Sequence, residues 1–486
     1  MTDEKKPEAA DVKADKPEPT DDLVETTHTL GDLTYKATTG RIVLREEVVE
    51  DDKFTGHKAK AEVSITSYVL EGVDVRERPV TFAFNGGPGS SSVWLHIGLM
   101  GPKRVVMGDA GALTPPPYGL TDNHETLLKH SDLVFIDPMS TGYSRAATGE
   151  KAKAYHGFTG DLESVAEIIR LWTTRNNRWL SPKYLAGESY GGTRAGALAD
   201  HLQMRYGMFL NGLMLIAPAL DMATLRFTEG NDGPYFHFLP TYAAIAHYHG
   251  LHEGRTLEDV VEEAKRYAAD EFPVVLAKGS RLSAEERAAA VSKLASLTGL
   301  SEEYVDGVNL RIEHVRYYTE LLRHRRLVVG RLDSRFTAPD SDYGREHFSS
   351  DPFFAAISGP YTAGLNHLLR SELKYENDLN YETLSRQVHP WSYSEFEGKH
   401  VTVVDKLSNA MRVNPYLRVY VAVGYYDGGV PPGAIEHSLA HLQIPEELRD
   451  NIQVEYFESG HMMYVHEESR LAQSQQLADF VTGVGA

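Results

Sequence analysis

The stretch that decides the fold is Gly187-Glu188-Ser189-Tyr190-Gly191-Gly192, which directly follows Lys183-Tyr184-Leu185-Ala186, a stretch that predicts a buried strand. A serine in a G-x-S-x-G turn between a strand and a helix is held in strained backbone geometry that lifts its Oγ above the sheet. Glycines stand where a Cβ would collide with neighbouring chain. Residues 193–205 then carry small apolar side chains at helical spacing. The pattern predicts a strand, a sharp turn that presents Ser189, and a helix.

Other apolar runs predict the rest of a sheet. Continuous runs at 80–84, 133–136, 213–216 and 419–423 are typical of parallel strands that are buried on both faces. Two earlier stretches, at residues 34–48 and 59–70, alternate as antiparallel strands do. We therefore expect an α/β fold with a mostly parallel central sheet.

Residues 221–395 interrupt this alternation with helical patterns, among them one that begins with a Ser283 and Glu286 capping pair. Ligands of open α/β sheets bind outside the carboxyl ends of the strands. We expect this region to be an inserted helical lid, or cap, over those ends, with a core formed by residues 27–220 and 396–486.

Composition limits the partners. The formal net charge of −20 argues against a nucleic-acid or anionic-membrane partner, because both require a basic patch. The 486 residues include no cysteine, which excludes disulfides, thiolate metal sites and a cysteine nucleophile. We expect no metal and no cofactor, and a monomer or homodimer.

The amino-terminal residues 1–26 are rich in Pro, Lys, Glu and Asp, which predicts a disordered charged tail. They contain no apolar run of the length that a signal peptide needs, and no later segment reaches the length of a membrane span. The expected location is therefore the cytoplasm, with a removed leader left open.

Two residues downstream of Ser189 could activate it. A serine hydroxyl needs an adjacent base, and the base needs a carboxylate that orients it. Asp427 follows the apolar run at 419–423, and His461 follows an apolar run at 454–457. Alone, Asp427 would be an ordinary Asp-Gly turn residue and His461 one of 21 histidines. Their order and their places at strand ends predict a triad of Ser189, Asp427 and His461.

The glycine-rich stretch NGGPGSSS at residues 85–92 ends another predicted strand. Its glycines would let a backbone N–H approach a substrate carbonyl closely, and the amide of Tyr190 would be a second donor to the oxyanion. A turn without a ligand is the alternative. A phosphate loop is excluded because no Gly-Lys-Ser/Thr follows.

Several motifs together resemble the serine carboxypeptidase family, of the cysteine-free bacterial type. They are NGGPGSSS at 85–92, DPMSTGYSR from Asp137, GESYGG at 187–192, YYDGGVP around Asp427 and SGHM around His461. We call the turn at 187–192, which carries Ser189, the elbow. The resemblance implies an α/β-hydrolase fold and hydrolysis from the C-terminus of a peptide substrate through an acyl-enzyme. It also implies catalysis by Ser189, Asp427 and His461, with oxyanion donors at Gly87 and Tyr190.

The match departs from the family at one position of the implied cage for the terminal carboxylate of the substrate. The resemblance implies a cage of Asn85, Gly86 and two glutamic acids that share protons; Glu188 matches one acid, whereas Leu99 stands at the position of the other. A missing acid removes a donor and the like-charge coupling that raises the apparent pKa of the pair. This predicts an activity that is less confined to acidic pH than in relatives with both acids.

A basic residue could supply the missing affinity for the carboxylate, since arginine suits bidentate capture. The candidates are Arg194, in the first turn after the elbow, Lys103 and Arg104. Arg194 equally fits a structural ion pair. Two alternatives to the carboxypeptidase hypothesis stay open: an esterase, acyltransferase or other peptidase with the same triad, and a binding protein without catalysis.

Overall fold

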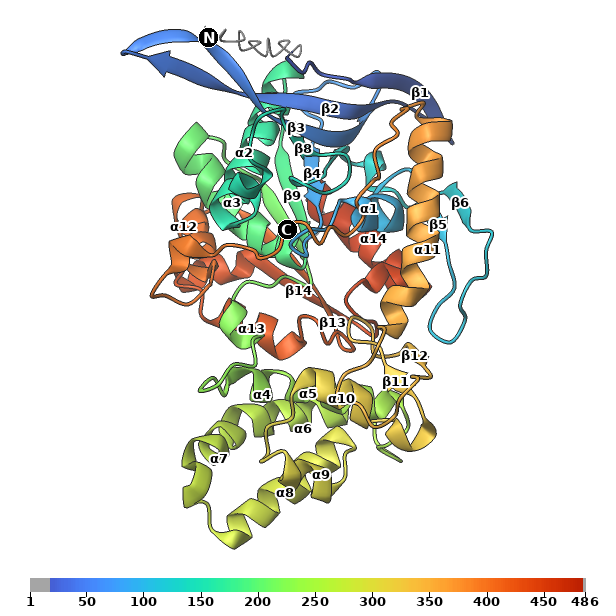
Figure 1. The fold of residues 1–486 in the computed structure, drawn as a ribbon, viewed down its shortest axis with the longest axis vertical. Helices are drawn as coiled ribbons and strands as arrows, with labels where there is room; N and C mark the ends of the chain where they lie inside the picture. Colours follow the sequence, from blue (N-terminus) through green and yellow to red (C-terminus); the bar gives the residue numbers. More distant parts are fainter. Residues whose placement is uncertain (1–17, 484–486) are drawn as a thin grey trace, which may run out of the picture.

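A computed structural model describes residues 18–483, and its centre is a mixed sheet of ten strands within that range (Figure 1). The strand order is β1-β2-β3-β7-β4-β9-β10-β13-β14, with the short β8 paired to β3. The bounds are β1 Val24–Leu30, β2 Leu33–Glu50, β3 Lys53–Leu70, β4 Val80–Phe84, β7 Asp132–Ile136, β8 Arg145–Ala146, β9 Lys183–Glu188, β10 Gly212–Ile216, β13 Arg418–Gly424 and β14 Ile452–Phe457.

The sheet has an antiparallel part and a parallel part. Strands β1, β2, β3 and β7 pair antiparallel, whereas every pair from β7 onward to β14 is parallel. Every residue of β4, β7, β9 and β10 is buried, as continuous apolar runs require. The predicted mostly parallel α/β sheet is confirmed.

Helices cover both faces of the sheet, and each face has its own cluster of buried side chains. One face is covered by α1 Val93–Leu95, α11 Pro352–His367 and α14 Glu467–Thr482. The other is covered by α2 Phe158–Arg175, α3 Tyr190–Tyr206, α12 Val404–Val413 and α13 Pro432–Ala440. A separate hairpin of β5 Lys103–Val106 and β6 Gly119–Asp122 lies beside α11 in Figure 1.

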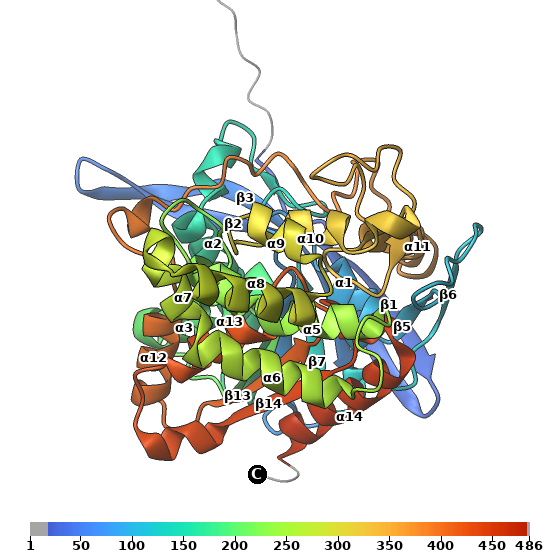
Figure 2. The same ribbon diagram turned by 90° about the horizontal axis from the view of Figure 1, so that it is seen from below.

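A second body of helices lies below the sheet in Figure 1 and in front of it in Figure 2, where α5, α6 and α8 overlie the sheet strands. These helices bury a third apolar cluster of their own. Their bounds are α4 Gly233–His237, α5 Leu239–Tyr248, α6 Leu257–Asp270, α7 Phe272–Lys278, α8 Ala284–Thr298, α9 Glu302–Gly307 and α10 His314–Glu320.

The predicted capping pair begins α8: the Ser283 hydroxyl accepts from the Glu286 N–H at 3.1 Å, and the Glu286 carboxylate accepts from the Ser283 N–H at 3.0 Å.

The segment that departs from the sheet returns next to its starting point. The N–H of Met222 donates to the carbonyl of Val401 at 2.9 Å, and the N–H of Val403 donates to that of Leu220 at 2.9 Å. Within the segment, β11 Val328–Val329 and β12 Thr337–Ala338 form a small ladder. Helix α11 packs on the sheet side, so the separate helical cluster is shorter than the predicted 221–395.

The prediction of a disordered tail over residues 1–26 is wrong for residues 18–26. Residues 1–17 lie outside the described part, but the Asp22 carboxylate accepts from the Arg41 guanidinium at 2.7 Å, and β1 begins at Val24. Charged residues at 18–26 are therefore ordered by pairing with the sheet edge. Between residues 18 and 483, none of the helices combines the length and the apolar character that crossing a membrane requires.

Candidate active site

Ser189 occupies the turn between β9 and α3 with φ 61° and ψ −124°, a backbone conformation that residues other than glycine rarely adopt. The turn is fixed from both sides, because the Ser189 N–H donates to the Ile216 carbonyl at 2.9 Å and the Ser189 carbonyl accepts from the Gly192 N–H at 2.9 Å. A Cβ on Gly187 would lie 2.2 Å from the Gly191 carbonyl oxygen. The local sequence thus builds the strained turn expected for a serine nucleophile, with Ser189 partly exposed.

His461 and Asp427 meet at the carboxyl ends of neighbouring parallel strands, β14 and β13. His461 Nδ1 lies 2.7 Å from Asp427 Oδ2, and both side chains are buried. The other carboxylate oxygen, Oδ1, accepts from the N–H groups of Gly429 at 2.7 Å and Val430 at 3.0 Å. Burial lowers the pKa of His461, but the charge and hydrogen bond of Asp427 more than offset it, so the pKa is raised. The pair is therefore suited to accept and hold a proton on the imidazole.

Ser189 and His461 line the same two pockets. Within residues 18–483, Ser189 Oγ makes no side-chain hydrogen bond, and the contact with His461 is not closed. Catalytic hydrogen bonds commonly tighten only when substrate is bound. The structure thus brings the three predicted residues to one place.

A loop from the helical segment also holds the histidine turn. The Leu332 carbonyl accepts from the His461 N–H at 2.6 Å, and the Asp333 carboxylate accepts from the Gly460 N–H at 3.3 Å. Asp333 is itself paired with the buried guanidinium of Arg335 at 2.7 Å. No local pattern in the sequence signals this role, because it depends on packing between distant segments.

The glycine-rich loop after β4 lies against the elbow. A Cβ on Gly86 would come within 2.4 Å of the Tyr190 nitrogen and 2.7 Å of the Glu188 carbonyl oxygen. These are backbone atoms and cannot give way, so only glycine fits. Gly87 follows with φ +105°, which also favours glycine. The loop therefore places Gly87 and Tyr190, the two predicted oxyanion donors, beside Ser189, and Gly87 lines both pockets.

Asp137 anchors this loop from behind. Its buried carboxylate accepts from the N–H of Ser92 at 2.9 Å and from the Ser92 hydroxyl at 2.8 Å. It also accepts from the hydroxyls of Tyr381 at 3.0 Å and Ser64 at 3.1 Å. Four donors on one carboxylate fix the loop position without any contact with the pocket. The sequence places Asp137 in a motif, but only the structure shows what it holds.

Glu188 lies next to the nucleophile and lines the larger pocket. Asn85 Nδ2 donates to Oε1 at 2.9 Å, and the Tyr464 hydroxyl donates to Oε2 at 2.6 Å. Burial raises the pKa of Glu188 to about 7, although the nearby His461 lowers it. Glu188 is therefore about half protonated near neutral pH. Its hydrogen-bonding partner is a phenol from another segment, not a second acid at position 99.

The basic residues predicted to replace the missing acid do not reach the site. The buried Arg194 pairs with Asp161 at 2.8 Å and donates to the Asn85 carbonyl at 2.7 Å. Lys103 pairs with Asp122 at 2.8 Å on the β5–β6 hairpin, and Arg104 follows it on β5. None of the three lines a pocket at Ser189. The prediction that Arg194 binds substrate is therefore corrected to a structural role. Asp161 neutralises its charge, and its guanidinium holds the glycine-rich loop through the Asn85 carbonyl.

Leu99 is buried in the short helical turn His96–Met100 and belongs to the apolar cluster on that face of the sheet. No carboxyl group replaces it from this turn. The cage predicted from Asn85, Gly86 and Glu188 is brought together, with Tyr464 as an added member.

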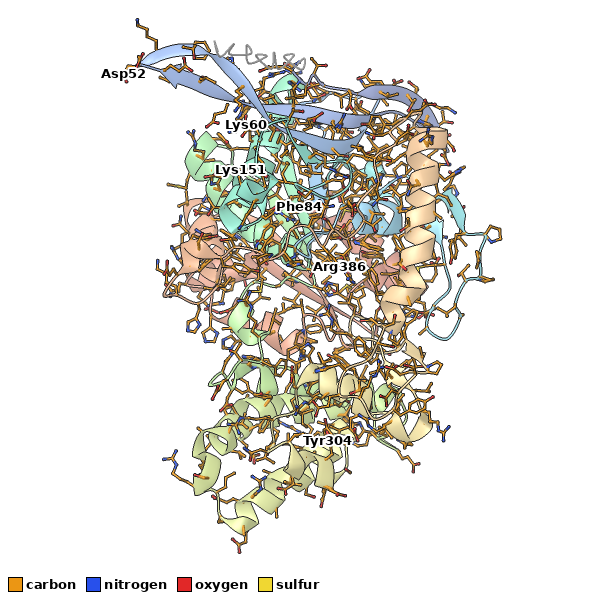
Figure 3. The ribbon with its side chains drawn as sticks, viewed as in Figure 1. Asp52, Lys60, Phe84, Lys151, Tyr304 and Arg386 are labelled. Atoms are coloured by element: carbon orange, nitrogen blue, oxygen red, sulfur yellow. The ribbon has the colours of Figure 1, made fainter. Side chains whose placement is uncertain are left out.

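Two pockets flank Ser189. The larger, with a volume of 650 Å³, contains Asn85 and Glu188, and we call it the carboxylate pocket. The smaller, with a volume of 430 Å³, contains Tyr190 but neither Asn85 nor Glu188; we call it the acyl pocket. Arg386, which lines the carboxylate pocket, is labelled near the middle of the molecule in Figure 3, above the lower helical body. Residues from the segment between β10 and β13, among them Leu332, line the pocket together with Ser189 and His461.

Comparison with known proteins agrees with this geometry. A family model described as serine carboxypeptidase matches residues 68–445. The pheromone-processing carboxypeptidase KEX1 of Yarrowia lipolytica is 31% identical over 144 residues, which are 29% of this chain and 22% of that protein. The chain thus aligns with about a fifth of the length of this curated relative.

Among solved structures, the prohormone-processing carboxypeptidase KEX1(delta)p of Saccharomyces cerevisiae has a TM-score of 0.53 and 15% sequence identity. The similarity covers 92% of this chain and 91% of that chain. At this level of identity it concerns the fold, which is the α/β-hydrolase arrangement expected from the sequence.

Proposed function

Because this chain belongs to the serine carboxypeptidase family, we propose that it removes single residues from the C-termini of peptides through an acyl-enzyme on Ser189. One observation carries the proposal: the strained turn at Ser189 lines the same two pockets as His461, whose Nδ1 lies 2.7 Å from Asp427 Oδ2.

The reaction follows from the positions of these groups. His461 takes the proton of Ser189 as Oγ attacks the last peptide carbonyl, and Asp427 orients the imidazole and stabilises its positive charge. The N–H groups of Gly87 and Tyr190 donate to the developing oxyanion. His461 then gives the proton to the leaving amine. Water, activated by the same imidazole, hydrolyses the acyl-enzyme.

Recognition of a free C-terminus is assigned to the carboxylate pocket. Protonated Glu188 and the amide of Asn85 would donate to the terminal carboxylate of the substrate, and the backbone at Gly86 would allow close approach. Tyr464 keeps Glu188 in place through its 2.6 Å hydrogen bond. A substrate would therefore lie with its leaving residue in the carboxylate pocket and its preceding residues in the acyl pocket.

The test compares N-blocked dipeptides that carry a free C-terminal acid or a C-terminal amide. The wild-type protein should release the last residue from the free acid with a higher kcat/KM. Ser189→Ala should lower kcat by a factor on the order of 10⁴ or more, since the nucleophile is lost. Its circular dichroism and unfolding midpoint provide the control for folding. Equal cleavage of acid and amide would contradict the exopeptidase assignment.

A second candidate function is that of an esterase or acyltransferase with the same triad. Leu99 favours it, because the carboxylate cage lacks one acid. Simple acyl esters cleaved faster than any free-acid peptide would support this candidate. A binding protein without catalysis would leave Ser189 unlabelled by a fluorophosphonate probe, whereas either hydrolase would be labelled in wild type and not in Ser189→Ala.

We also propose that the protein acts in the cytoplasm. Its cysteine-free sequence supports this proposal, because none of its stability depends on an oxidising compartment. Immunodetection in fractionated cells tests the location.

A further inference from the structure

The acyl pocket differs from the carboxylate pocket in its charges. Two arginines, Arg226 and Arg331, line it, and no aspartate or glutamate does so among the residues that the structure describes. The carboxylate pocket, by contrast, contains Glu188 and Asp351. In a chain with a formal charge of −20, a pocket whose charged side chains are arginines is unusual and points to an anionic ligand.

Neither guanidinium is paired with a carboxylate of the described residues. Within residues 18–483, Arg226 and Arg331 form no salt bridge, whereas the buried Arg194 and Arg335 each pair with an aspartate. The exposed Arg226 lies over the ring of Tyr393, with 4.8 Å between its Cζ and the ring centroid. A cation over an aromatic ring is held there by the ring quadrupole and keeps its full charge.

Arg331 is placed at the border between the two pockets, since it lines both. Its main chain is fixed: the N–H donates to Asp351 Oδ2 at 3.1 Å, and the carbonyl accepts from the Gly428 N–H at 2.9 Å. A Cβ built on Gly429 would lie 3.5 Å from its Nη1, so the guanidinium passes close to the turn that carries Asp427. The Arg331 guanidinium thus lies beside the turn that carries Asp427, in a residue that lines the same pocket as Ser189.

We propose that the acyl pocket selects an acidic side chain, glutamate or aspartate, on the residue whose carbonyl Ser189 attacks. This inference rests on the proposed function, which sets the direction of the substrate across Ser189. Arginine forms bidentate hydrogen bonds with carboxylates, and the rings of Trp391 and Tyr393 in the same pocket offer apolar surface to the methylene groups. A lysine at this position would meet like charges.

The test uses N-acetyl dipeptides that end in leucine and differ only in the first residue: Glu, its neutral isostere Gln, or Lys. We expect kcat/KM at low ionic strength to be about tenfold higher for Glu than for Gln, which corresponds to one charge-assisted hydrogen bond. Lys should be the poorest. The ratio of Glu to Gln should fall as salt is added, because the pocket is partly open to solvent.

Variants identify the residues responsible. Arg226→Gln and Arg331→Gln should each reduce the ratio of Glu to Gln, and Arg226→Glu should shift the preference towards Lys. Arg266→Gln is the matched control, because this exposed arginine lies on α6, lines neither pocket and should leave the ratio at its wild-type value. Equal cleavage of Glu and Gln by the wild type, or an unchanged ratio in both pocket variants, overturns the inference.

Methyl esters of N-acetyl-Glu and N-acetyl-Gln separate this inference from the proposed function, since they place the same side chains in the acyl pocket without a leaving amino acid. A preference for Glu among esters, with no preference for free acids over amides, supports the pocket assignment and contradicts the carboxypeptidase assignment. A preference for free acids without any difference between Glu and Gln supports the carboxypeptidase assignment and contradicts the pocket assignment.

Discussion

At the scale of single residues, Glu188 links the nucleophile strand to the recognition of substrate charge. It is buried beside Ser189, and its two oxygens are bound by Asn85 and Tyr464. Because its pKa is raised to about 7, the neutral form that can donate to a carboxylate predominates below that pH, and the charged form that repels one predominates above it. Under the proposed function, the protonation of this one side chain would control binding of the free C-terminus.

This arrangement predicts a pH dependence that is specific to free-acid substrates. Their kcat/KM should fall as the pH rises through about 7, whereas amide and ester substrates should not show this fall. Glu188→Gln, which stays neutral, should abolish the fall. The measurement is a pH profile of kcat/KM for matched acid and amide substrates.

Tyr464→Phe is the companion variant. The phenol hydrogen bond lowers the pKa of Glu188, so its removal should move the fall for free acids to higher pH. Profiles of wild type and Glu188→Gln that coincide would contradict the role of Glu188.

At the scale of elements, the loop after β11 carries part of the site although it belongs to the segment between β10 and β13. Asp333 is fully buried and connects Arg335 to the histidine turn at Gly460. Breaking a buried ion pair leaves an uncompensated charge. The loop therefore couples the helical segment to the position of His461.

Asp333→Asn should lower the free energy of unfolding by about 3 kcal/mol, because Arg335 loses its counter-charge. It should also lower kcat by a factor on the order of 10 to 100, since the imidazole is displaced. Denaturant unfolding and steady-state kinetics measure the two effects.

Asp306→Asn is the control. This aspartate pairs with Arg287 at 2.7 Å, but its side chain is 56% exposed, so the change should cost less than about 1 kcal/mol and leave kcat unchanged. Equal effects of the two substitutions would contradict the special position of Asp333.

Most elements of the sheet could be predicted from the sequence. The run at 80–84 coincides with β4, and the runs at 133–136 and 213–216 differ from β7 and β10 by one residue, because strands buried on both faces must be apolar throughout. The elbow could be predicted because its glycines are required by close backbone contacts.

The parts of the site that the sequence did not reveal depend on contacts between distant segments. Tyr464 reaches Glu188 across 276 positions of the chain, and Leu332 contacts the histidine turn from the helical segment. Arg194 follows the elbow and therefore suggests a contact with substrate, but its partner Asp161 lies on another helix. Neither periodicity nor spacing encodes such pairings.

At the scale of the whole molecule, three large apolar clusters stabilise different parts of the described chain. Two lie on opposite faces of the sheet, and the third is formed mainly by α5 to α10. Leu294 on α8 and Leu215 on β10 are both fully buried but belong to different clusters. Parts with separate cores open with different free energies.

Leu294→Ala should destabilise its own cluster by about 2 to 5 kcal/mol, the usual cost of a cavity at a buried leucine. Amide hydrogen exchange should therefore accelerate in α6, α8 and α9 and remain slow in the sheet. Leu215→Ala is the matched comparison and should accelerate exchange in the sheet. A uniform acceleration by Leu294→Ala would show that the clusters open together.

The backbone bonds that join Met222 to Val401 and Leu220 to Val403 have an evolutionary consequence. A segment whose two ends meet can be replaced as a unit, because the flanking strands keep their register whatever lies between. Ser189 precedes the segment and Asp427 follows it, so recombination at this junction would preserve the chemistry provided that the new segment keeps the contacts of Leu332 and Asp333 with the histidine turn. Arg226 and Arg331 lie inside it, and a new preference for substrates would arrive in a single genetic exchange.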